Sequence, residues 1–166
     1  MLKLNLGCGN RLLEGYINAD LQLTPPARAR GATPDNFRIL DMTDLGLYSN
    51  GSVDEIRCHR AIRHLPEEKV IKALQEWARV LRPGGLLLVE VADIQVICQR
   101  ILDSQDPEQR IKISRTMYGG LGEEGLPMRS AWWPERLETE LKAAGFSMIT
   151  RRPGEASYTF RMEAIK

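Results

Sequence analysis

The chain of 166 residues has the length of one domain whose hydrophobic core is large enough to fold without disulfides or a structural metal. Hydrophobic residues make up 43% of the sequence and charged residues 27%, which excludes a disordered chain. The net charge of +1 gives no reason to expect nucleic acid or a membrane surface as the partner. No apolar run approaches the length that spans a membrane. We therefore expect a single globular domain over residues 1–166.

The cysteines predict the redox environment. Cys8, Cys58 and Cys98 are odd in number and far apart, which is typical of reduced thiols in a cytoplasmic protein. The alternative for each is a small buried hydrophobic residue. Cys58 adjoins His59, and His64 follows, but this spacing does not match a zinc site. The expectation is a cytoplasmic protein without a metal centre.

Residues 2–10, with the sequence LKLNLGCGN, predict a buried strand that runs into a turn with two glycines. The alternating leucines give the largely apolar character of a strand in a parallel sheet. Gly7 and Gly9 allow the backbone to turn sharply and to bring its N–H groups close to a ligand. Such turns bind nucleotide-like cofactors in doubly wound sheets, although paired glycines alone more often mark an ordinary turn.

A second strand is expected at residues 16–21, and only residues 11–14 separate it from the glycine turn. The usual crossover helix between parallel strands is therefore very short or missing. Asp20 ends the second strand, where a carboxylate can accept hydrogen bonds from both hydroxyls of a ribose. The alternative is a turn-forming aspartate that accepts from nearby backbone N–H groups. The glycine turn upstream favours the ribose interpretation.

The remaining pattern alternates strands and helices, which is typical of an α/β fold. The clearest helix covers residues 66–82, where Val70, Leu74 and Trp77 share one apolar stripe. Residues 119–133 are rich in glycine, lack a hydrophobic period and form a candidate flap. The last two strands are joined by a link too short for a parallel crossover, so they predict an antiparallel hairpin. The other expected elements are an irregular stretch at 21–36, strands at 37–40, 53–59, 86–92, 146–151 and 158–165, and helices at 94–102, 107–118 and 134–144.

Three segments and the final hairpin together resemble one known family. The segments are LNLGCGN at 4–10, GYINAD at 15–20 and RVLRPGG at 79–85. In this order and spacing the chain resembles the class I S-adenosylmethionine-dependent methyltransferases, especially small bacterial members with a glycine-cysteine-glycine turn. The resemblance implies a Rossmann-like α/β fold with a seven-stranded, mostly parallel sheet, helices on both faces, and an antiparallel last strand inserted beside the fifth.

The resemblance also implies the cofactor S-adenosyl-L-methionine and a set of residues that bind it. The glycine turn would lie along the methionine part, Asp20 would hold the ribose, and Asp41 and Met42 would border the adenine. His59 would lie near the transferred methyl group. The complete implied set is Asn5, Leu6, Gly7, Cys8, Gly9, Asn10, Asp20, Leu21, Asp41, Met42 and His59.

The chain departs from the common pattern of this family at three positions. Asn5 stands where many members have an acid, and Arg11 stands where many have a third glycine. Arg63 stands where relatives often carry the acid of a Glu-His pair. An amide at position 5 can still form hydrogen bonds with nearby backbone or with the cofactor amine, whereas Arg63 reverses a charge.

His59 and His64 are the two histidines of the chain and the candidate catalytic residues. Both follow the expected strand at 53–59, at the edge where open α/β sheets bind ligands. Methyl transfer from a sulfonium needs alignment, and it needs a base only when the acceptor must lose a proton. His59 is the candidate base and His64 a contact to the acceptor or a residue at a helix start. A structural role for either remains an alternative, and Glu90 is equally a site acid or a salt-bridged structural residue.

The expected reaction transfers a methyl group to an oxygen or nitrogen atom of a small molecule or glycan precursor, because no nucleic-acid-binding module is visible. Tyr118, Trp132 and Trp133 would line an acceptor pocket or simply pack. Two other functions stay open. An NAD-dependent oxidoreductase would need a third glycine where Leu12 stands and a full crossover helix. A non-catalytic cofactor-binding or scaffold protein would use the same fold without the reaction.

Overall fold

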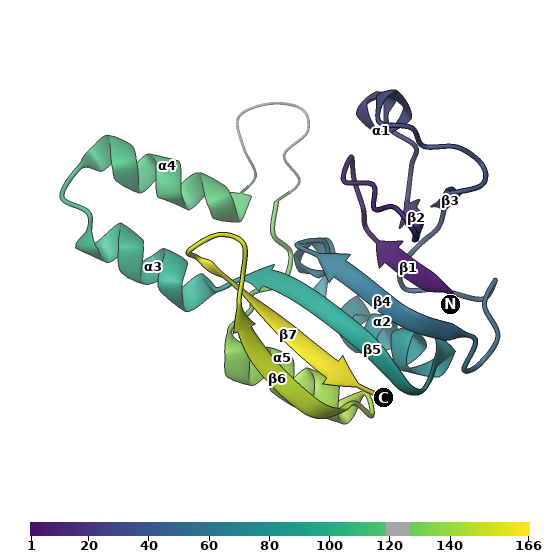
Figure 1. Ribbon diagram of the computed structural model, residues 1–166. Coiled ribbons are helices and arrows are strands. Elements are labelled where there is room, and N and C mark those ends of the chain that lie inside the picture. The colour runs from purple at the N-terminus through teal and green to yellow at the C-terminus, as the bar shows by residue number, and fades with distance from the viewer. Residues whose placement is uncertain (119–126) are drawn as a thin grey trace.

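The computed structural model describes residues 1–118 and 127–166, and a mixed β-sheet with seven strands among these residues lies at its centre (Figure 1). The strand order is β3-β2-β1-β4-β5-β7-β6. Strands β1 to β5 pair in parallel, whereas β7 is antiparallel to both β5 and β6. This confirms the predicted topology, with the last strand inserted beside the fifth. The strands are β1 Lys3–Leu6, β2 Ile17–Asp20, β3 Phe37–Ile39, β4 Val53–His59, β5 Leu81–Ala92, β6 Ser147–Pro153 and β7 Thr159–Ile165.

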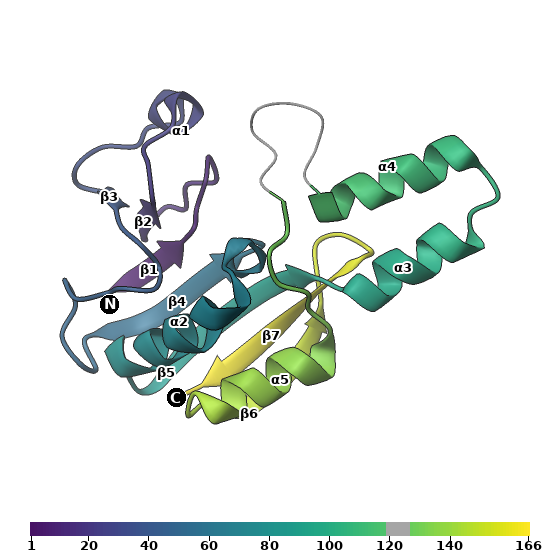
Figure 2. The same cartoon turned by 180° about the vertical axis from the view of Figure 1, so that it is seen from behind.

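The helices occupy distinct positions around this sheet. Helices α2 and α5 lie side by side on one face, and α3 and α4 form a pair that projects beyond the carboxyl end of β5 (Figure 2). In the part of the chain that the structure describes, no helix is long and apolar enough to cross a membrane. The helices are α1 Pro25–Ala29, the short 3-10 helix η1 Ile62–His64, α2 Glu67–Val80, α3 Ile94–Asp103, α4 Pro107–Tyr118 and α5 Pro134–Ala143.

The largest differences from the prediction lie in two segments. Helix α1 forms within the stretch expected to be irregular, and the Thr24 hydroxyl caps it by accepting from Ala27 N at 3.2 Å. Strand β5 begins at Leu81, so the predicted helix at 66–82 extended too far. Leu81 already pairs with Val53, and the register then shifts before Glu55 pairs with Leu86. The Pro-Gly-Gly sequence therefore lies in an irregular part of a strand rather than in a separate turn.

The core between the sheet and helix α2 contains the predicted apolar stripe. Val70, Leu74 and Trp77 are each at most 2% exposed. The Trp77 indole also donates to the Met42 carbonyl at 2.8 Å, which attaches the loop after β3 to helix α2. Trp132 is fully buried and packs in the same core, so the packing alternative holds for this residue.

The predicted flap at 119–133 falls largely outside the described residues, which resume at Pro127. Its described end is attached to the short helix η1. The backbone N–H groups of Arg129 and Ser130 both donate to the Arg63 carbonyl, at 2.8 and 3.2 Å. This attachment brings residues remote in sequence to the carboxyl end of strand β4.

Candidate functional site

The glycine turn lies after β1, at the edge where the carboxyl ends of the parallel strands β1, β2 and β4 meet. Gly7 and Gly9 have φ angles of 62° and 55°, in the left-handed region that favours glycine. A Cβ on Gly7 would lie 2.3 Å from the Ala61 Cβ and 2.8 Å from the Met42 Cε. A Cβ on Gly9 would meet no atom within 4 Å. Neighbouring loops thus close on the first glycine, while the second faces open space.

Asp20 holds this turn from the end of β2. Its Oδ2 accepts from the N–H of Gly9, eleven residues earlier in the sequence, at 2.7 Å. Its Oδ1 accepts from the N–H of Leu21 at 2.8 Å. A carboxylate oxygen has two lone-pair directions, so each oxygen retains one for a ligand hydroxyl. Asp20 can therefore both stabilise the turn and accept hydrogen bonds from a ribose, the two roles that the sequence left open.

Two buried amides hold the connection between β1 and β2, where the chain forms turns without a crossover helix. Asn5 is 2% exposed, and its Nδ2 donates to the Arg11 carbonyl at 2.9 Å and to the Asn18 Oδ1 at 2.8 Å. Asn18 is 1% exposed, and its Oδ1 also accepts from Leu13 N at 2.8 Å. Asn5 therefore stabilises the connection by linking the Arg11 carbonyl to strand β2. Sequence reasoning missed this role of Asn18, because the pairing joins residues of different strands.

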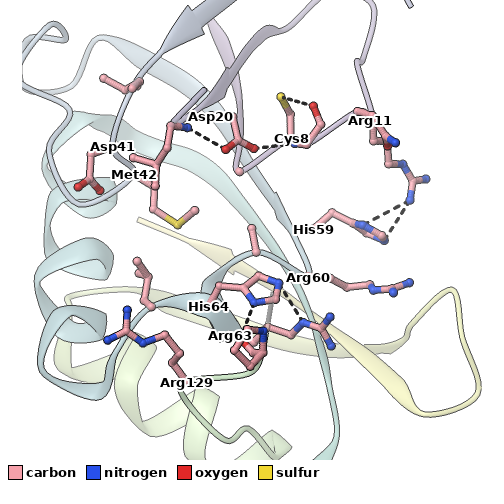
Figure 3. A pocket seen from close by; sticks show the side chains of 18 residues that line it. Cys8, Arg11, Asp20, Asp41, Met42, His59, Arg60, Arg63, His64 and Arg129 are labelled. Carbon is pink, nitrogen blue, oxygen red and sulfur yellow. Dashed lines mark hydrogen bonds between the residues drawn. The ribbon is translucent and has the colours of Figure 1, made fainter. Parts of the chain in front are cut away.

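A pocket of about 680 Å³ opens between the glycine turn and the loops after β3 and β4 (Figure 3). This volume lies in the range of small-molecule and cofactor sites. Asp20 and Asp41 lie on one side, and His59, Arg60 and Arg63 lie on the other. The lining residues are Gly7, Cys8, Gly9, Asn10, Arg11, Asp20, Leu21, Leu40, Asp41, Met42, His59, Arg60, Ala61, Arg63, His64, Leu65, Pro127 and Arg129.

The first of these sides fits the nucleoside part of S-adenosylmethionine. The Asp20 carboxylate retains acceptor capacity for the ribose hydroxyls. Leu21 borders the pocket with 67% of its surface exposed, and Leu40 and Met42 add apolar surface beside it. An adenine ring would cover this apolar surface, and the open space above Gly9 would admit the amino-acid part close to the backbone.

His59 lies among charged groups at the end of β4. Its Nε2 lies 3.1 Å from Arg11 Nη1, 3.4 Å from Glu90 Oε1 and 3.2 Å from Glu155 Oε2. Burial is the largest influence and lowers the pKa of His59 below its ordinary value of 6.5, although Glu90 opposes the shift. The imidazole is therefore neutral at neutral pH and chemically able to accept a proton.

Arg11 supplies the positive charge of this cluster. Its guanidinium donates two hydrogen bonds to the Glu155 carboxylate, at 2.6 and 2.7 Å, and lowers the pKa of Glu155 to about 2. His59, Glu90 and Glu155 place potential metal-ligand atoms within 4.8 Å of one another. The Arg11 guanidinium already neutralises Glu155 and faces His59, so an ion pair accounts for this grouping without a metal.

His64 has both ring nitrogens engaged within the protein. Its Nδ1 lies 2.9 Å from the Pro127 carbonyl, which can only accept, so this nitrogen carries the proton. Its Nε2 accepts from Arg63 Nε at 3.3 Å. Burial, together with repulsion from Arg63 and Arg60, lowers the pKa of His64 below 6.5. This geometry supports a positioning role that fixes the segment beginning at Pro127 beside the pocket.

The two thiols near the pocket are unreactive. Burial is the main cause that raises the pKa of Cys8 and of Cys58, each to about 12. Both stay protonated at neutral pH and are poor nucleophiles. All three cysteines are free, and Cys98 is exposed. Cys8 therefore lines the pocket as a small neutral side chain and not as a nucleophile.

The pocket brings together most of the site residues that the sequence predicts. Of the cofactor set, Asn5 and Leu6 lie behind the turn, and the others line the pocket together with both histidines. Sequence reasoning missed Arg60 and Arg129 as lining residues. Arg60 directly follows β4, which was a usable signal, whereas nothing local in the sequence places Arg129 at this edge.

Comparisons with known proteins agree with this geometry. A family model described as a methyltransferase domain matches residues 4–89, which is more than half of the chain. A ubiquinone biosynthesis O-methyltransferase of Xanthomonas oryzae pv. oryzae (strain PXO99A) is 28% identical over 99 residues. That match covers 52% of this chain and 41% of the relative, so the chain matches less than half the length of this curated relative.

Solved structures share the fold across nearly the whole chain. The PH0226 protein from Pyrococcus horikoshii OT3 has a TM-score of 0.72 at 18% identity, covering 98% of this chain and 80% of that one. A SAM-dependent methyltransferase from Archaeoglobus fulgidus has a TM-score of 0.67 at 12% identity, covering 99% of this chain and 85% of that one. At these identities the likeness concerns the fold.

The amide at position 5 yields a test of the turn. Asn5→Asp replaces a donor that serves two acceptors, the Arg11 carbonyl and the Asn18 Oδ1, with a buried carboxylate that has no proton to donate. We expect the free energy of unfolding to fall by about 3 kcal/mol, measured by urea denaturation. Asn10→Asp makes the same change at an exposed position and is the control for stability. An equal loss of stability in both variants would contradict the conclusion that Asn5 stabilises the connection between β1 and β2.

The two histidines can be titrated separately by NMR. Burial lowers both pKa values, so we expect both midpoints below 6.5. Between the lowered values and 6.5 the unfolded chain binds more protons than the folded chain, and stability therefore rises with pH across this window. Urea unfolding between about pH 5 and pH 7 should show this rise. A midpoint at or above 6.5 for either ring would disprove the assignment for that ring.

Proposed function

Because this chain belongs to the methyltransferase domain family, we propose that it transfers the methyl group of S-adenosylmethionine to an oxygen or nitrogen atom of a small-molecule or glycan-precursor acceptor. The observation that carries the proposal is the position of Asp20. Its carboxylate accepts from the Gly9 N–H and also lines the pocket, beside the half-buried Met42 and the exposed Leu21. This arrangement pairs an acceptor for ribose hydroxyls with apolar surface for a base. Residues 1–166 would form the one domain that carries out this reaction.

The cofactor supplies an activated methyl group on a sulfonium. The residues of the chain would bind the donor and the acceptor, orient them towards each other and exclude water. Asp20 and the backbone of the glycine turn would hold the donor, and the loops after β3 and β4 close the site around Gly7. Such alignment of donor and acceptor provides much of the rate enhancement in group transfer.

His59 is the residue we propose as the base for an acceptor that must lose a proton. Its imidazole lines the pocket, and its lowered pKa keeps it neutral near pH 7. Glu90 and Glu155 lie on the same side of the ring and would stabilise the imidazolium that forms. Arg11 opposes that charge and positions Glu155. His64 would hold the acceptor side of the pocket in place.

The alternative oxidoreductase receives less support. A dinucleotide cofactor places its pyrophosphate at the amino end of a crossover helix. Between β1 and β2 this chain forms turns only, in a stretch that the structure describes completely. The free thiols of Cys8 and Cys58 fit a reducing compartment, and we propose the cytoplasm as the site of the reaction.

The donor site is tested by Asp20→Ala. Loss of two hydrogen bonds to a charged acceptor should weaken binding of S-adenosylmethionine about a hundredfold, measured by calorimetry. Asp35→Ala removes an exposed aspartate outside the pocket and should leave the affinity within about twofold. A parallel titration with NAD should give no binding. Binding of NAD in place of S-adenosylmethionine would favour the oxidoreductase, and binding of neither would favour the scaffold.

The base is tested by His59→Gln on an oxygen acceptor that the wild-type chain methylates. We expect kcat to fall about 100- to 10,000-fold while the KM for S-adenosylmethionine changes little. The wild-type rate should also decline as pH drops below 6.5, because His59 becomes protonated, and the variant should lose this decline. Full turnover in the variant would remove His59 from the mechanism.

A further inference from the structure

The charges that line the pocket are segregated. Asp20 and Asp41 lie on the side of the glycine turn. Asp20 accepts from the backbone N–H groups of Gly9 and Leu21, and Asp41 accepts from that of Thr43. Arg60 and Arg63 extend to the opposite side, past His64, whereas the Arg129 side chain extends in the other direction (Figure 3). The pocket therefore offers acceptor atoms at one end and the neighbouring cationic side chains of Arg60 and Arg63 at the other.

Arg60 and Arg63 lack carboxylate partners within the described residues, whereas another pocket arginine, Arg11, is paired with Glu155. Arg63 makes its hydrogen bonds to neutral groups, from Nε to His64 Nε2 at 3.3 Å and from Nη1 to the Thr116 carbonyl at 3.2 Å. Burial and repulsion from Arg60 both lower the pKa of Arg63. A half-buried guanidinium beside a second one is an unfavourable arrangement that a bound anion relieves.

The backbone fixes where these side chains begin. Arg60 has a φ of 59°, rare for a residue other than glycine, and its N–H donates to the Glu90 carbonyl at 2.7 Å. The Arg129 N–H donates to the Arg63 carbonyl at 2.8 Å, which ties the segment after residue 126 to helix η1. These hydrogen bonds hold the backbone at Arg60 and at Arg63, so both side chains start from fixed positions at the pocket.

The position of this cationic side matters because the proposed function assigns the other side to the donor. With the donor on Asp20, Gly9 and Met42, the space beside His59 and Arg60 is left for the acceptor. The sulfonium adds another positive charge to the same pocket. An anionic acceptor would neutralise it together with the arginines.

We propose that Arg60 and Arg63 form an anion-binding subsite that takes a phosphate group of the methyl acceptor. Guanidinium groups bind phosphate oxygens through paired, charge-assisted hydrogen bonds. A phosphate monoester carries a charge of about −1.5 to −2 at neutral pH, and so matches two neighbouring guanidinium groups better than a single carboxylate does. This inference rests on the proposed function, since it assigns the subsite to the acceptor.

The test compares two single variants of equal charge. Arg60→Gln removes one arginine of the subsite and leaves Arg63, which also holds the Thr116 carbonyl, in place. Arg28→Gln removes an exposed arginine outside the pocket. Binding of inorganic phosphate to each protein loaded with S-adenosylhomocysteine is followed by phosphorus NMR at low salt, and affinity for S-adenosylhomocysteine is measured by calorimetry.

We expect Arg60→Gln, the first variant, to bind phosphate at least about tenfold more weakly than wild type, and Arg28→Gln, the second, to stay within about twofold. Affinity for S-adenosylhomocysteine should be unchanged in both. Equal phosphate binding by the two variants, or none by the loaded wild type, would overturn the subsite. A parallel loss of S-adenosylhomocysteine affinity in the first variant would also overturn it, by assigning the arginines to the carboxylate of the cofactor.

The same measurements separate this inference from the proposed function. If wild type fails to bind S-adenosylhomocysteine, the methyltransferase proposal fails. Phosphate titration of the unloaded proteins then still reports whether the arginines bind an anion. If S-adenosylhomocysteine binds and phosphate does not, the subsite fails and the donor site stands.

Discussion

The hydrogen bond between the buried amides of Asn5 and Asn18 is the interaction on which the site depends. Parallel strands normally need a helix between them, and here the connection from β1 to β2 is made of turns. Buried backbone groups in such a connection need partners. Asn18 provides them for Leu13, and Asn5 provides one for Arg11. With the connection fixed in this way, Gly9 presents its N–H to Asp20.

The same turn is also connected to the far end of the chain. Arg11 reaches Glu155 in the turn between β6 and β7, across 144 residues of sequence. Glu90 holds that turn, because its Oε1 accepts from Glu155 N and from Thr159 Oγ1, each at 3.0 Å. Glu90 thus acts as a structural acid and also faces His59, at 3.4 Å. The environment of His59 is therefore set jointly by both ends of the chain.

The sequence predicted the fold because its elements are marked locally. Strand β4 and helix α4 match the predicted ranges, and the stripe of Val70, Leu74 and Trp77 identified helix α2. Helix α1 was missed because its five residues are too few to show a hydrophobic period. The roles predicted for Asp20 and His59 stay predictions, although both line the pocket. The pairing of Asn5 with Asn18 and the position of Arg129 depend on tertiary contacts that no local pattern encodes.

The lack of a crossover helix also sets the electrostatic character of the pocket. A helix amino terminus carries roughly half a positive charge, which favours phosphates at the glycine turn of dinucleotide-binding sheets. Here the turn is held by neutral amides and by the carboxylate of Asp20, and the positive charge comes from arginines on the opposite side. A donor without phosphate groups suits such a turn. It needs acceptors for its ribose hydroxyls and a backbone that it can approach closely, and it needs no positive charge to bind a phosphate. Anionic groups are drawn instead to the side of the pocket where His59 lies, and that is the side left for the acceptor.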